Sequence, residues 1–97
     1  MQKSQKISVR EVKNIVKRYI KVLRKDGFDI HSAFLYGSFS RGTFHEGSDI
    51  DVAIISPTFE KNREAREKLM WHHILDVDSR LEPVGYTPKE FNPIDPL

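Results

Sequence analysis

The chain contains no cysteine, which excludes disulfide bonds and thiolate metal sites. It has no apolar run near the ~18 residues that would span a membrane, and its lysine-rich start lacks a signal-peptide pattern. With 38% hydrophobic and 31% charged residues, the composition is typical of a soluble globular protein. We therefore expect a cytoplasmic protein whose 97 residues form a single domain, 1–97.

A large excess of charge is also lacking, because 16 basic residues face 14 acidic ones and leave a net charge of +2. More than half of the basic residues lie within the first 25 positions. Such a run is more typical of the solvated face of a helix than of a nucleic-acid site, and no aromatic residues alternate with it. Nucleic acid is therefore not the expected partner.

Local patterns predict alternating helices and strands. Ser8 and Glu11 have the spacing of a capping box, and apolar residues then recur every three or four positions until Gly27, which can end the helix. Trp71 is expected to pack over the sheet or the first helix. Because proline has no amide donor, the strand that contains Pro83 is expected to be an edge strand or to stop pairing at this residue. The remaining elements are predicted as strands 28–36, 49–55 and 79–84, a short helix or turn 38–42, and helices 60–73 and 87–91.

Asp49 and Asp51 are two positions apart at the start of a strongly apolar strand. Residues i and i+2 of a strand point to the same face, so the two carboxylates lie on one side of the sheet. Two unpaired carboxylates at that distance repel one another unless a cation lies between them. The pair therefore indicates a divalent metal site.

Gly37 and Ser38 follow the preceding apolar segment directly. Glycine permits a tight turn and close approach of the backbone, and the N–H groups that follow such a turn favour an anion. A phosphate-accepting turn beside a carboxylate pair suggests a site for a nucleoside triphosphate with Mg²⁺.

Together these residues resemble a family signature. Gly37-Ser38-x-x-Arg41-Gly42, followed by Ser48-Asp49-x-Asp51, is similar to the motif of polymerase-beta-type nucleotidyltransferases. The short chain resembles their minimal single-domain branch, the MNT proteins. The resemblance implies an α/β (α+β) fold, with a small mixed β-sheet and helices packed on one face, as in the polymerase-beta palm.

The resemblance also implies ATP as nucleotide substrate and a two-metal Mg²⁺ site that needs a third carboxylate from a later strand. Glu82 fits that place best, where it would bind the second metal and help take the acceptor proton. Asp76 and Asp78 have the same strand parity and remain alternatives.

The resemblance assigns a phosphate-binding role to the loop residues. Gly37 and Ser38 would contact the β- and γ-phosphates. Arg41 would brace the loop or counter the phosphate charge, although a salt bridge to a core carboxylate is an equal alternative. Ser48 is expected to steady the turn into the strand, and catalysis is assigned to Asp49, Asp51 and Glu82.

Larger nucleotidyltransferases carry a second, helical domain that holds the acceptor, so here we expect a second copy or another protein to provide that surface. Many minimal members pair with a helical HEPN protein in toxin–antitoxin modules. The resemblance implies transfer of AMP to a tyrosine of such a partner. The alternative is a non-catalytic antitoxin that only binds nucleotide and partner. Transfer to a small molecule or an RNA end is a weaker possibility.

Overall fold

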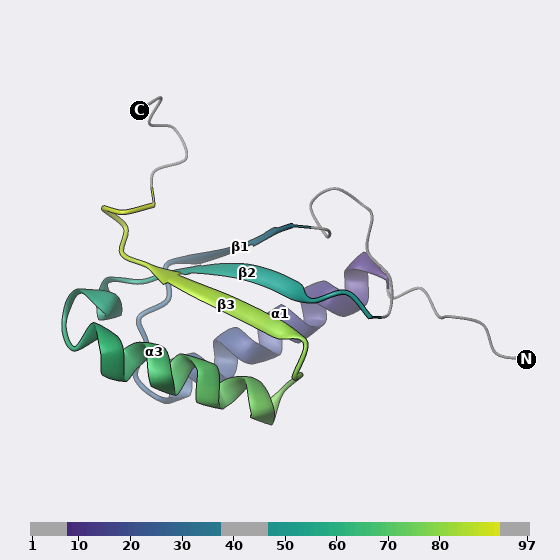
Figure 1. Cartoon of the computed structure of the whole chain (residues 1–97), viewed down its shortest axis with the longest axis horizontal. Helices are drawn as coiled ribbons and strands as arrows, with labels where there is room; N and C mark the ends of the chain where they lie inside the picture. Colours follow the sequence, from purple (N-terminus) through teal and green to yellow (C-terminus); the bar gives the residue numbers. More distant parts are fainter. Residues whose placement is uncertain (1–7, 38–46, 92–97) are drawn as a thin grey trace, which may run out of the picture.

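The computed structural model describes residues 8–37 and 47–91 (Figure 1). The described residues form a mixed α/β structure, as the sequence predicts. The elements in chain order are α1 (Val9–Lys25), β1 (Ser32–Tyr36), β2 (Ile50–Ile55), the 3₁₀ turn η1 (Pro57–Glu60), α3 (Arg63–His72), the 3₁₀ turn η2 (His73–Asp76) and β3 (Leu81–Tyr86).

The first helix begins and ends where its local signals predict. The Ser8 hydroxyl accepts a hydrogen bond from the Glu11 amide, and the Glu11 carboxylate accepts one from the Ser8 amide, which completes the capping box. After the last turn, Gly27 takes a positive φ of 91° that other residues rarely adopt. The apolar stripe of α1 is buried, and its buried members are Val12, Ile15, Val16, Tyr19 and Leu23.

The strands form one mixed sheet in the order β1-β2-β3. Strand β2 pairs antiparallel with β1 and parallel with β3. A parallel pair needs a long crossover, and the segment that contains α3 provides it. Both helices lie on the same side of the sheet (Figure 1). Within residues 8–37 and 47–91, no helix covers the opposite side, which is referred to as the open face.

The core lies between the sheet and the two helices. Ile50, Val52 and Ile54 of the central strand point into it and are fully buried. The Tyr19 hydroxyl of α1 donates a hydrogen bond to the main-chain carbonyl of Met70 in α3. This bond joins the two helices on their side of the sheet. Burial raises the pKa of Tyr19, so the group remains a neutral donor.

Three predicted elements have a boundary that differs by two residues or more from the one observed. The first strand begins at Ser32 instead of residue 28, although Phe28 and Ile30 are buried in the segment before it. The second helix begins at Arg63 instead of residue 60, because η1 precedes it and Asn62 adopts a left-handed conformation with φ 52°. The third strand is Leu81–Tyr86 instead of residues 79–84.

Other predictions of packing can also be compared with the structure. Pro83 is indeed in an edge strand, since β3 pairs only with β2 within the described part of the chain. The prediction for Trp71 was wrong: its side chain is 45% exposed, and the neighbouring Met70 occupies the core instead. Thr87 and Glu90 form reciprocal capping hydrogen bonds, but the segment that follows is a turn and not a helix.

No helix within residues 8–37 and 47–91 is long and apolar enough to cross a membrane.

Candidate active site

Asp51 lies on the open face of the sheet, on the opposite side from the helices. Its neighbours Ile50 and Val52 point into the core, so strand alternation turns Asp51 outward. The parallel register pairs Asp51 directly with Glu82 of β3. Two carboxylates from different strands therefore occupy adjacent positions on the same face.

Asp49 precedes β2 and joins this pair. Partial loss of hydration raises the pKa of Glu82, and the negative charges of Asp49 and Asp51 raise it further. A side-chain hydrogen bond with Asp49 also favours the protonated form of Glu82. Glu82 thus lies close enough to both aspartates for their charges to repel its own, and a cation placed among these side chains would relieve that repulsion.

This repulsion predicts a pH-dependent effect of Glu82→Gln on stability. Because the pKa of Glu82 lies above its ordinary 4.5 in the folded chain, the unfolded chain loses this proton at lower pH. Ionisation of Glu82 therefore reduces the free energy of unfolding as pH rises from the pKa of Glu82 in the unfolded chain to its raised pKa in the folded chain. We expect Glu82→Gln to have a larger free energy of unfolding than the wild type at about pH 7. The free energies of unfolding of the two proteins should become equal near pH 4. Urea unfolding across this range measures the effect, and an equal difference at every pH would contradict it.

Gly37 provides the close backbone approach beside this cluster. It ends β1 with a positive φ of 72°, and a β-carbon built at this position would overlap the Asp51 carboxylate. Only glycine combines this backbone conformation with the space that Asp51 requires. The glycine of the predicted phosphate turn and the central predicted metal ligand are therefore in direct contact.

Tyr36 also belongs to this site, although its sequence context did not indicate it. The antiparallel register pairs Tyr36 with Asp51, on the side opposite Glu82. Loss of hydration raises the pKa of Tyr36, and the charges of Asp51 and Glu82 raise it further. Strand parity could have placed Tyr36 on the correct face, but only the register shows that it is next to Asp51.

The rest of the open face is largely apolar. Phe34 and Val84 flank Ala53 in the next row of the sheet and are 45% and 38% exposed. Phe91 stacks on Phe34 with ring centroids 5.2 Å apart and lies 5.3 Å from the ring of Tyr86. An acidic row therefore adjoins an aromatic and aliphatic surface on a single face.

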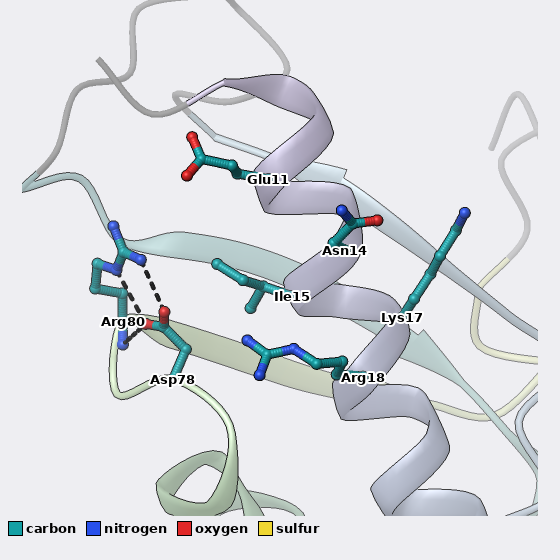
Figure 2. A pocket seen from close by; sticks show the side chains of 7 residues that line it. All are labelled: Glu11, Asn14, Ile15, Lys17, Arg18, Asp78 and Arg80. Carbon is teal, nitrogen blue, oxygen red and sulfur yellow. Dashed lines mark hydrogen bonds and ion pairs between the residues drawn. The ribbon is translucent and has the colours of Figure 1, made fainter. Parts of the chain in front are cut away.

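The two alternative carboxylates have partners elsewhere. Asp78 accepts hydrogen bonds from the main-chain amide and guanidinium of Arg80 at 2.7–2.9 Å, and Arg80 lowers its pKa (Figure 2). Asp76 bonds to His73, which also contacts Asp26. Glu82 is thus the candidate that lies beside Asp51.

The predicted phosphate-binding residues are described only in part. Ser48 is half-buried immediately before Asp49, which agrees in position with a turn leading into β2. Ser38 and Arg41 lie outside the described residues, as does the predicted short helix 38–42. Their roles remain predictions.

The donor chemistry of Asp49, Asp51 and Glu82 fits a hard divalent cation, because carboxylate oxygens are the ligands that Mg²⁺ prefers. Within the described ranges, no group of three or more His, Asp or Glu side chains is gathered closely enough to hold a metal ion unaided. Mg²⁺ usually binds through one or two carboxylates together with water and substrate phosphates. The site therefore fits an ion that is shared with a phosphorylated substrate.

Comparisons with known proteins agree with this chemistry. A family model described as "Nucleotidyltransferase domain" matches residues 9–93. A Methanocaldococcus jannaschii protein named "Putative protein adenylyltransferase MJ1305" is 32% identical over 91 residues, which cover 84% of this chain and 62% of that protein. The chain thus spans less than two thirds of the length of this curated relative. No solved structure matches the chain significantly.

Proposed function

Because the chain belongs to the nucleotidyltransferase domain family, we propose that it transfers AMP from Mg-ATP to a hydroxyl group of a partner protein in the cytoplasm. Pyrophosphate is the leaving group. The observation that carries the proposal is the pairing of Asp51 with Glu82 on the open face, next to Gly37 and Asp49.

Each acidic residue has a proposed role. Asp49 and Asp51 would hold the metal ion that accompanies the triphosphate, and Glu82 would contribute a carboxylate to a second metal ion. Bound Mg²⁺ would neutralise phosphate charge and promote loss of the proton from the attacking hydroxyl. Glu82 would also help to accept that proton. Gly37 allows the backbone to approach the β- and γ-phosphates, with Ser38 as the adjacent hydroxyl donor.

The proposed acceptor is a tyrosine of a HEPN-type partner, in a toxin–antitoxin module where this chain is the antitoxin. Two observations support a protein acceptor. The similar M. jannaschii protein has a name that specifies protein adenylyltransferase activity. In addition, exposed Phe34 and Val84 give the open face an apolar surface beside the carboxylates, where a partner's side chains could pack.

Intact-mass spectrometry can test this proposal with the chain, ATP, Mg²⁺ and a HEPN-type partner. We expect the partner to gain the mass of one AMP, the gain to require the metal, and peptide mapping to place it on a tyrosine. Absence of an adduct, while the chain still binds nucleotide and partner, would contradict the proposal and favour a non-catalytic binding module.

The Asp49→Asn, Asp51→Asn double variant separates these functions further. If transfer is the function, the folded double variant should no longer neutralise the partner's toxicity. Neutralisation that survives in this variant would mean that binding alone is sufficient. Circular dichroism of the variant provides the control for folding.

A further inference from the structure

A groove runs between α1 and the edge strand β1, on the helix side of the sheet. It consists of two hollows of about 400 and 270 Å³ that share Lys17 and Ile20 and so adjoin one another. Its apolar lining on the helix side consists of Val16, Ile20, Ile30, Ala33 and Leu35, and Phe34 contributes to the border along β1. An apolar surface of this extent is suited to cover by another chain.

The outer edge of β1 borders this groove. Within residues 8–37 and 47–91, β1 pairs with β2 and with no other strand. An edge strand presents outward-facing N–H and C=O groups that can pair with an additional strand. The groove therefore offers main-chain hydrogen bonds as well as apolar contacts.

Three lysines form a rim along the helix side of the groove, namely Lys13, Lys17 and Lys21. All three are exposed, and none forms an ion pair with another described residue. Figure 2 shows Lys17 extending away from the Asp78–Arg80 pair, which lies on the other side of α1. Farther along, Arg24 donates a hydrogen bond to the Ile30 carbonyl and closes that end of the groove.

The spacing of the lysines matches that of an extended chain. Lysines four residues apart on a helix are about 6 Å apart along its axis. Alternate side chains of a strand are separated by about 6.7 Å. The lysine spacing and the side-chain spacing of a strand are therefore nearly equal over the five residues of β1, which span about 17 Å. An added strand could thus place three alternate carboxylates opposite three consecutive lysines.

We propose that this groove binds an extended acidic segment of a partner protein, which adds to the sheet as a fourth strand beside β1. Its acidic side chains lie on the helix side, where their methylene groups cover the apolar floor of the groove and their carboxylates face Lys13, Lys17 and Lys21. Its apolar side chains alternate with them and lie beside Phe34 on the open face. Sheet-edge pairing supplies affinity, and the lysines select acidic sequences. This docking does not depend on the proposed transfer reaction.

The groove favours a peptide over a nucleic acid. Phosphate groups could contact the lysines, but they would not use the apolar floor or the main-chain groups of β1. The rim also lacks the interleaved aromatic residues on which single-stranded bases stack. Binding of RNA is therefore an alternative outcome of the test.

Titration of the isotope-labelled chain, followed by NMR, can test the proposal with synthetic octapeptides. The probe alternates glutamate and valine; the comparison peptides alternate lysine and valine, or carry four glutamates followed by four valines. We expect only the alternating acidic peptide to shift the amides of β1 and the methyl groups of Val16 and Ile20. Equal binding of the lysine peptide or the block peptide would overturn the proposal, as would the absence of any shift in β1.

Two triple variants with the same change in charge provide the control. Reversal of the rim by Lys13→Glu, Lys17→Glu and Lys21→Glu should weaken binding of the acidic peptide by about tenfold or more. The control variant reverses the charge of three lysines outside the groove by Lys25→Glu, Lys61→Glu and Lys68→Glu. Its binding of the acidic peptide should be nearly unchanged. Equal losses in both variants would show that only net charge matters and would overturn the proposal. A uridine oligonucleotide that binds through the rim, where the acidic peptide does not, would also overturn it.

Discussion

Asp51→Asn should abolish AMP transfer while leaving the fold intact. Asparagine has nearly the same shape but lacks the charge that would hold a metal against the triphosphate. Metal-based charge stabilisation provides several kcal/mol, so we expect the rate to fall about a thousandfold or more. Because Asp51 contributes to the repulsion around Glu82, stability should be unchanged or slightly higher. Intact-mass time courses and urea unfolding of the same preparation measure the two quantities.

Asp29→Asn is a suitable control for this experiment. The Asp29 side chain is exposed before β1 and forms a long ion pair of 3.5 Å with His31, so its change removes the same charge at the other end of the sheet. Transfer should continue in Asp29→Asn at nearly the wild-type rate. Full activity of Asp51→Asn, or loss of its fold, would contradict the assigned role of Asp51.

Some features of the fold could be predicted because they depend on neighbours in the sequence. The capping box at Ser8, the apolar stripe of α1 and the left-handed end at Gly27 are all encoded within a few residues of one another. The same applies to the alternation that places Asp51 away from the core. The segment before β1 was predicted less well, because buried Phe28 and Ile30 resemble strand residues although they do not pair within the sheet.

The composition of the candidate site depends instead on contacts between distant segments. Strand parity left Asp76, Asp78 and Glu82 equivalent, since parity does not specify which position lies beside Asp51. The parallel register places Glu82 beside Asp51, while Arg80 binds Asp78. The position of Tyr36 likewise depends on the antiparallel register of β1 with β2. Such registers are set by packing of the whole sheet, which single-sequence patterns do not specify.

Gly37→Ala should have the second large effect, because it combines backbone strain with a direct clash. A non-glycine residue in this left-handed conformation costs about 1–2 kcal/mol. The new β-carbon would also overlap the Asp51 carboxylate, so either Asp51 or the turn must move. Misplacement of a reacting group by ~1 Å can cost about a hundredfold in rate. We therefore expect a loss of stability together with a fall of that size in transfer.

Gly27→Ala separates the two causes. Gly27 also has a positive φ, but no atom lies within 4 Å of a β-carbon built there, so its variant has the strain without the clash. We expect Gly37→Ala to lose more stability than Gly27→Ala, as measured by urea unfolding. Adding Asp51→Ala should remove most of that difference, because the remaining Asp51 β-carbon lies at an ordinary contact distance of 3.4 Å. Equal losses in the two single variants, or no rescue in the double variant, would mean that Gly37 serves only the turn and does not position Asp51.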